Sequence, residues 1–213
     1  MAHIVDSVSR SFVTLKEMLV DRNIDVKALE AVSDAELVER ITGAQGSIAV
    51  LEVNAELNVV YCMSSTAPKM PELRAVIGDS EGAEAEADGA DAAAAGKSKA
   101  QYIVITKEPL QAILVKKVHT TDEFKHAQVQ FFTLAELQFN ISRHCLASKH
   151  TIVAEADVAE VMASYLVKSK SQFPNILKTD PMARYINAQP GDLVKIVRPS
   201  PSAGEYVSYR CCL

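Results

Sequence analysis

The chain has 213 residues, of which 48% are hydrophobic, with a mean hydropathy of +0.06 and a formal net charge of −5. This length can bury one large core or two small ones, and we expect two small domains. Every strongly apolar stretch is interrupted well before the roughly 18 residues that a membrane span needs, and the start lacks the pattern of a secretory signal, which predicts an intracellular protein.

The first 78 residues predict two helices, a strand pair and a third helix. Apolar residues recur at helical spacing in the first segment, at Val5, Val8, Phe12, Leu15 and Leu19. The letters "SDAE" from Ser33 form a capping box, and that helix should end at Gly43. Branched residues at 47–53 and 57–63 predict a hairpin, and Pro71 is placed to start a helix that ends near Gly78.

Residues 79–99 alternate Gly, Ala and acids, with six Asp or Glu against two Lys. Without large apolar residues, this stretch cannot bury enough surface to offset the entropy cost of ordering, which predicts a flexible acidic loop. A functional alternative is an acidic segment that mimics nucleic acid or steers a basic partner.

Regular structure should resume with a third strand at 101–106, a helix after Pro109 and a fourth strand at 129–133. We place the joint between the domains in the segment that follows. The predicted fold class is therefore α+β. It has an N-terminal domain at 1–137 with helices and a mixed sheet, and a small C-terminal α/β domain at 138–213 that also has a mixed sheet.

The C-terminal part predicts a short strand followed by a helix with Val158, Val161, Met162 and Tyr165 on one side. Pro174 and Pro181 make the next segment a turn region, and Asp180 before Pro181 has the pattern of a helix N-cap. Residues 192–197 and 205–210 should pair as strands. The first of these strands is apolar on both faces and is therefore predicted to be central.

Sequence patterns of enzyme sites are weak in this chain. No Gly-rich phosphate loop occurs, and neighbours such as His144 and Cys145 face apart on a helix. Glu52 would fit a metal-dependent nuclease core, but position 54 is Asn where such cores usually have Lys. The four cysteines form no C-x-x-C pair, and Cys211 and Cys212 point to opposite faces if extended. We predict no catalytic residue, no metal site and no cofactor.

Residues 138–213 are mildly basic, with nine Lys or Arg against six Asp or Glu, and basic and aromatic residues lie near one another in the last 30 positions. Three interpretations stay open for these side chains. They can contact nucleic acid, anchor a protein interface, or lie half in the core with their polar ends in water. The basicity is far below that of a typical nucleic-acid stripe, so the protein interface is favoured over nucleic acid.

The C-terminal motifs resemble the assembly domain of the fifth common subunit of eukaryotic nuclear RNA polymerases, a family with an archaeal counterpart. The matching stretches are "DPMARY" at 180–185, "VKIVR" at 194–198 and "AGEYVSYR" at 203–210, preceded by Pro174 and Ile176. Upstream, Asn140, Ile141, His144, Leu146 and His150 match a further family segment. The first 135 residues resemble the family's N-terminal jaw domain in outline only, and the acidic loop is an insertion.

The resemblance implies a non-catalytic structural subunit of nuclear DNA-directed RNA polymerase, located in the nucleus, the nucleolus included. Its C-terminal domain would dock on the largest catalytic subunit and a small neighbouring common subunit, with the N-terminal domain as lower jaw near downstream duplex DNA. The resemblance implies no membrane, cofactor or small-molecule substrate. The predicted partner-binding residues are Asp180, Pro181, Arg184, Tyr185, Lys195, Arg198, Tyr206, Tyr209 and Arg210.

One loop of the family lies near DNA, and its place is taken here by the shorter "KEPLQA", in which Lys107 is the obvious phosphate contact. A subunit shared by several polymerases and a class-specific version both fit the divergent first half. The alternatives to a polymerase subunit are a stand-alone nucleic-acid-binding protein and a nuclease-like enzyme that would depend on Glu52.

Overall fold

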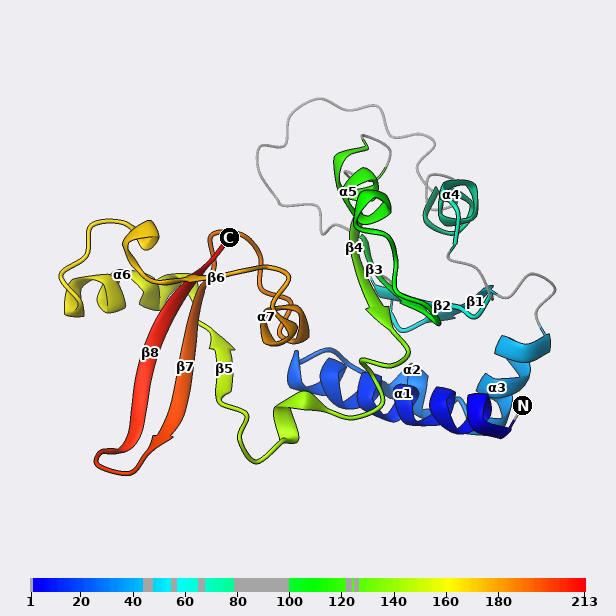
Figure 1. Ribbon diagram of the computed structural model, residues 1–213, viewed down its shortest axis with the longest axis horizontal. Coiled ribbons are helices and arrows are strands. Elements are labelled where there is room, and N and C mark those ends of the chain that lie inside the picture. The colour runs from blue at the N-terminus through cyan, green and yellow to red at the C-terminus, as the bar shows by residue number, and fades with distance from the viewer. Residues whose placement is uncertain are drawn as a thin grey trace, which may run out of the picture. The chain divides into compact units, whose positions relative to one another are not determined.

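The computed structural model describes residues 2–43, 48–54, 57–64, 68–78, 100–121, 124 and 127–213 (Figure 1). The predicted flexible loop at 79–99 lies outside these residues. The chain forms two compact units, one of Met1–Lys16 with Asp25–Phe139 and one of Glu17–Ile24 with Asn140–Leu213, called here the N-terminal and C-terminal units. Within the described part of the chain, no helix is both long and apolar enough to cross a membrane.

The N-terminal unit contains a four-stranded mixed sheet in the order β1-β2-β3-β4. β1 is antiparallel to β2, which confirms the predicted hairpin, while β2, β3 and β4 run parallel. β2 and β3 are buried on both faces because they lie between other strands and carry runs of branched residues. The strands are β1 (Ile48–Glu52), β2 (Leu57–Cys62), β3 (Ala100–Thr106) and β4 (Ala127–Thr133).

Helices cover both faces of this sheet. Leu73 of α4 and Val118 of α5 join a buried cluster with Val60 and Tyr102 of the strands, while the Oγ of Ser11 in α1 lies 3.4 Å from the hydroxyl of Tyr61. The helices are α1 (Ala2–Asp21), α2 (Lys27–Glu30), α3 (Asp34–Gly43), α4 (Met70–Gly78) and α5 (Ala112–Thr120).

Two details of the helix predictions can be compared with the structure. The one-turn α2 adds a third helix to the predicted opening pair, and its four residues are too few to show a helical period. The N-cap role predicted for Ser33 is confirmed, since its Oγ accepts a hydrogen bond from the backbone N–H of Glu36 at 3.2 Å, while the Glu36 carboxylate pairs with Arg40.

The C-terminal unit has a second mixed sheet in the order β5-β7-β8-β6, so β7 is central as predicted. β7 and β8 form a long antiparallel hairpin that extends beyond the other two strands (Figure 1). The strands are β5 (Lys149–Ile152), β6 (Asn175–Ile176), β7 (Leu193–Ser200) and β8 (Gly204–Cys212). The helices are η3 (Ile141–Arg143), α6 (Glu155–Ser164), η4 (Lys170–Gln172) and α7 (Pro181–Tyr185).

A buried cluster lies on each face of this sheet. On one face, here the α6 face, Leu193 and Cys211 pack with Val158 of α6. On the other, the α7 face, Val194 and Cys212 pack with the buried cluster that includes Ala183. The neighbouring cysteines therefore point to opposite faces, as the alternation of an extended strand predicts.

The hairpin is longer than predicted, because β7 continues through Pro199 and Ser200. Pro199 pairs with Glu205 across the ladder. Cys211 and Glu205 are an even number of positions apart in β8, so their N–H groups point to the same side of the strand. The N–H of Cys211 points away from β7, to the carbonyl oxygen of Pro174. Pro199 therefore occupies a non-hydrogen-bonded pair, where its missing N–H breaks no bond to β8.

Candidate protein-docking surface

The nine residues predicted to bind a partner do not share one face of the C-terminal unit. The strand residues separate by their alternation, with Arg198, Tyr206 and Arg210 on the α7 face and Lys195 and Tyr209 on the α6 face. The remaining four residues belong to α7 and its N-cap.

Two of the α7 residues start the helix. The Asp180 carboxylate accepts hydrogen bonds from the backbone N–H groups of Met182 at 2.9 Å and Ala183 at 3.4 Å. Pro181 is exposed at the first helical position, where its fixed φ favours the helix and its missing N–H would have no helical partner. Asp180 is thus an N-cap, which confirms the predicted helix start.

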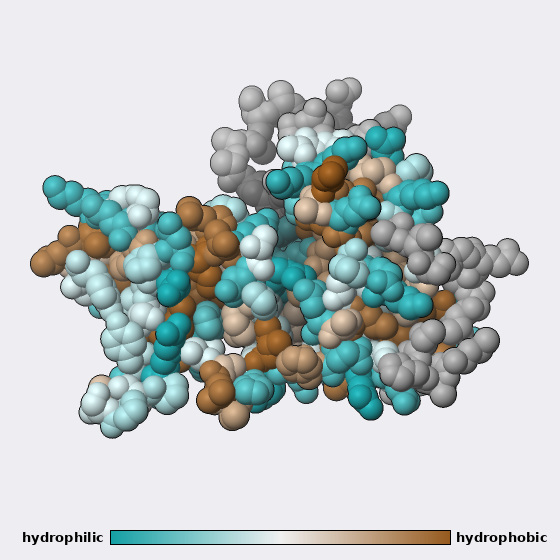
Figure 2. Space-filling model, viewed as in Figure 1, coloured by the Kyte–Doolittle hydropathy of each residue, from teal (hydrophilic) through white to brown (hydrophobic). Residues whose placement is uncertain are grey.

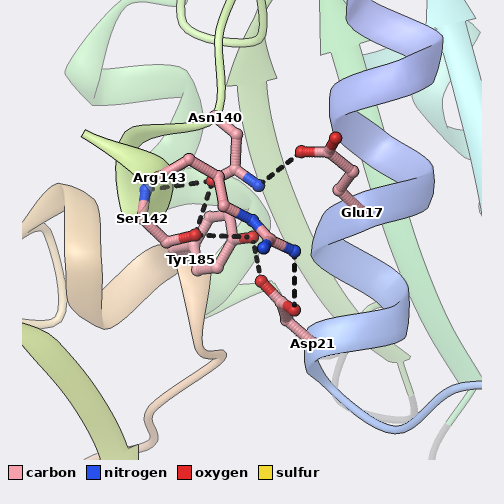
Figure 3. A network of polar contacts seen from close by, with 6 residues as sticks. All are labelled: Glu17, Asp21, Asn140, Ser142, Arg143 and Tyr185. Carbon is pink, nitrogen blue, oxygen red and sulfur yellow. Dashed lines mark hydrogen bonds and ion pairs between the residues drawn. The ribbon is translucent and has the colours of Figure 1, made fainter. Parts of the chain in front are cut away.

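Tyr185 is buried, with 6% of its surface exposed, and its hydroxyl lies in a polar network (Figure 3). This hydroxyl donates to the carboxylate of Asp21 at 2.7 Å and accepts from the Oγ of Ser142 at 3.3 Å. Burial is the main cause that raises the pKa of Tyr185 above its usual value, so the hydroxyl stays protonated at neutral pH. Its geometry is that of an internal brace.

Asn140 extends the same network toward η3 and the end of α1. Its side-chain amide donates to the carboxylate of Glu17 at 2.7 Å, and its Oδ1 accepts from the backbone N–H and the Oγ of Ser142 (Figure 3). Arg143 adds an ion pair with Asp21 at 3.7 Å. Residues 17–24 are thereby joined to the segment that precedes β5.

Arg22 connects the same segment to the end of α7. Its Nε donates to the carbonyl oxygen of Tyr185 at 2.8 Å, and its Nη2 donates to the carbonyl oxygen of Arg184 at 2.9 Å. Both carbonyls lie in the last turn of α7, beyond the regular i+4 hydrogen bonds of the helix, and that of Arg184 also accepts from the backbone N–H of Asn187 at 3.2 Å. Arg22 therefore acts as an additional C-cap from a distant part of the chain. Burial lowers the pKa of Arg22 to about 10, which leaves the guanidinium charged at neutral pH.

Sequence reasoning missed Glu17, Asp21 and Arg22. Their partners lie more than 100 residues away, and the helical period of α1 marks only its apolar face. Asn140 carried a local signal, because an Asn two residues before a Ser suits the turn that the structure shows.

On the α7 face of the hairpin, Arg198 and Tyr206 are cross-strand neighbours and both are exposed, Tyr206 to 59%. Arg210 is half-buried, and its Nη1 donates to the carbonyl oxygen of Asn175 at 3.0 Å. In the view of Figure 2 the tip of the hairpin, at the lower left, carries mainly pale and hydrophilic side chains. The two arginines give this accessible face a positive charge.

On the α6 face Tyr209 is part of an aromatic group. Its ring lies edge-on to that of Tyr165, with centroids 5.4 Å apart, and 6.3 Å from that of Phe173. Lys195 lies opposite Tyr209 in the ladder and is half-buried. Packing of this kind stabilises the fold, so Tyr209 has a core role whether or not it also meets a partner.

The other candidate residues lie elsewhere. Lys107 directly follows β3 in the N-terminal unit and is exposed, with its backbone N–H bonded to the carbonyl of Cys62 at 3.3 Å. The Nδ1 of His144 accepts from the backbone N–H of Leu146 at 3.2 Å, which gives this ring a turn-forming role. Glu52 is exposed on the edge strand β1.

Comparison with known proteins finds similarity to one family, mainly in the C-terminal part. Residues 139–212 match the family model described as RNA polymerase Rpb5, C-terminal domain. A Dictyostelium discoideum protein named as a subunit of DNA-directed RNA polymerases I, II and III is 37% identical over 125 residues, which are 53% of this chain and 63% of that protein. Proteins of the same name from Caenorhabditis briggsae and Caenorhabditis elegans are each 43% identical over 82 residues, 38% of either chain. The chain thus spans less than two thirds of the length of these curated relatives.

Proposed function

We propose that this chain is a non-catalytic structural subunit of a nuclear DNA-directed RNA polymerase, because its residues 139–212 match the family model described as RNA polymerase Rpb5, C-terminal domain. The relatives named as subunits of polymerases I, II and III support this proposal. The same proposal places the protein in the nucleus, the nucleolus included.

The observation that carries a docking role is the exposed, positively charged α7 face of the β7–β8 hairpin. Arg198, Tyr206 and Arg210 are of the residue types that anchor protein interfaces, and the sheet beneath them is held by a buried cluster. We assign this face to the largest catalytic subunit and a small neighbouring common subunit. Asp180 and Tyr185 then support that face from inside through the cap and the polar network.

For the N-terminal unit we propose the role of a lower jaw near downstream duplex DNA, with Lys107 as a phosphate contact. Its exposure after β3 supports the assignment, since phosphate contacts need a reachable cation. One such contact contributes little affinity, so the isolated chain should bind duplex DNA weakly.

Affinity purification of the tagged chain from nuclei, with identification of its large partners, tests the function. We expect recovery of the largest polymerase subunits. The double variant Arg198→Glu, Arg210→Glu should reduce that recovery at least tenfold, because it reverses two charges at the docking face. The matched control Lys107→Glu, in the other unit, should leave recovery unchanged.

Two outcomes would contradict the proposal. Purification that recovers no polymerase subunit would remove the assembly role, and a double variant that assembles like the wild type would remove the α7 face from it. Tight binding of duplex DNA by the isolated chain, lost steeply on adding salt, would support the stand-alone nucleic-acid-binding alternative instead.

A further inference from the structure

The outer edge of β8 carries main-chain groups that face away from its partner β7. The backbone N–H of Cys211 donates outward to the carbonyl oxygen of Pro174, whereas the N–H of Cys212 donates on the other side to Asp192. Successive residues of a strand alternate in this respect. The N–H groups of Val207 and Tyr209 and the carbonyls of Glu205, Val207 and Tyr209 therefore point to the outer edge.

β6 covers only the far end of that edge, and proline explains why it stops there. β6 runs parallel to β8 and pairs only with Cys211 and Cys212. The next bond of this ladder would need an N–H at position 174 to reach the carbonyl of Tyr209, and Pro174 has none. Within the described residues no strand pairs with the outer edge of β8 from position 205 to position 209.

This edge lacks the features that usually prevent pairing with another chain. The opposite edge of the sheet, β5, is only four residues long and includes Lys149 and His150. β8 from 205 to 210 has no proline and no lysine, and Val207 and Ser208 are half-exposed strand positions. A bare, regular edge is a template for an additional strand, so its lack of protection indicates that another chain covers it.

The charges beside the edge indicate the chemistry of that other chain. On the α7 face the strands carry Arg198, Arg210 and His150, and they carry no Asp or Glu there. An added strand with acidic side chains on this face would complement Arg210, the arginine next to the edge. A second copy of this chain would instead bring two more arginines to the same face, which disfavours it.

We propose that positions 205–209 of β8 form a strand-addition site for an extended, acidic segment of another polypeptide. This inference rests on the proposed function, because it states in which conformation the partner polypeptide binds at the docking face. Only an extended chain offers N–H and carbonyl groups at the repeat of a strand, so a helix or a nucleic acid cannot satisfy this edge. Side chains of the added strand would lie beside Tyr206 and Arg210 on the α7 face.

A proline at Val207 tests the main-chain bond directly. Val207→Pro removes the outward N–H without touching the ladder to β7, since edge strands tolerate proline at such positions. Val207→Ala is the matched control, because it shortens the side chain and keeps the N–H. In affinity purification of the full chain from nuclei, we expect Val207→Pro to lose at least tenfold in recovered large subunits and Val207→Ala to stay within about twofold of the wild type.

Equal recovery with both variants would overturn the strand addition while leaving the proposed function in place. Failure of the wild type to recover any polymerase subunit would overturn both. Hydrogen exchange of the wild type guards against misfolding of the proline variant. The amides of Val207 and Tyr209 should exchange at least tenfold more slowly in the purified complex than in the free chain, while that of Ser208, which points to β7, should be slow in both.

Sedimentation of the free chain tests whether a second copy of this chain binds to the edge of β8 instead. We expect a monomer at micromolar concentration. A wild-type dimer that Val207→Pro dissociates would identify a second copy as the added strand and overturn the assignment to a different polypeptide. Unchanged exchange at Val207 and Tyr209 in the complex would likewise contradict the proposal.

Discussion

At the scale of single residues, Tyr185 separates a supporting role from a docking role. Tyr185→Phe removes the hydroxyl that donates to Asp21 and leaves that carboxylate with one partner fewer. We expect the free energy of unfolding of the C-terminal unit to fall by about 1–2 kcal/mol, measured by urea denaturation. Tyr206→Phe is the matched control, since its exposed ring should change stability by less than about 0.5 kcal/mol.

The pH dependence of the same variant gives an independent check. Because burial raises the pKa of Tyr185 in the folded chain, the unfolded chain loses this proton first, at about pH 10. The stabilisation that the protonated Tyr185 hydroxyl contributes is complete below that pH and is lost as the pH rises through the pKa of the folded chain. The stability difference between wild type and Tyr185→Phe should therefore shrink in alkaline solution. A difference that is constant from about pH 8 to about pH 11 would argue against a buried, protonated hydroxyl.

At the scale of secondary-structure elements, Asp180 tests whether α7 depends on its cap. Asp180→Ala removes the acceptor for two backbone N–H groups and should lower the free energy of unfolding by about 1 kcal/mol. Asp180→Asn keeps an acceptor and should recover most of that loss in the same denaturation experiment. If Asp180→Asn is stable but fails to assemble with the large subunits, the carboxylate itself contacts a partner.

Elements with local signals could be predicted from the sequence, and those that depend on distant partners could not. A few neighbouring residues are enough to predict the caps at Ser33 and Asp180 and the apolar strand β7. β6 exists only because β8 lies beside it, and Pro174 makes its sequence resemble a turn. Alternation within a strand separates Lys195 from Arg198, but which residues of β8 share a face with each of them depends on the register of the hairpin, which no local pattern gives.

At the scale of the whole molecule, the C-terminal unit is not continuous in sequence. It contains Glu17–Ile24 together with Asn140–Leu213, whereas the family match covers 139–212. The inserted piece supplies Asp21 to the hydroxyl of Tyr185 and Arg22 to the last carbonyls of α7. The end of α1 therefore completes a fold whose recognisable motifs all lie far downstream.

A fragment of residues 138–213 should consequently be less stable than the same residues in the full chain. It lacks the bonds that Asp21 and Arg22 make to the hydroxyl and carbonyl of Tyr185 and to the carbonyl of Arg184, and we expect the loss of these three bonds to cost about 3 kcal/mol. The amides of Val194 and Ile196, in the middle of β7, should exchange about a hundredfold faster in the fragment. The full chain with Arg22→Ala and Tyr185→Phe should reproduce most of that change, because it removes the same bonds while keeping the chain intact. Equal exchange in fragment and full chain would show that residues 17–24 contact residues 140–213 without stabilising them.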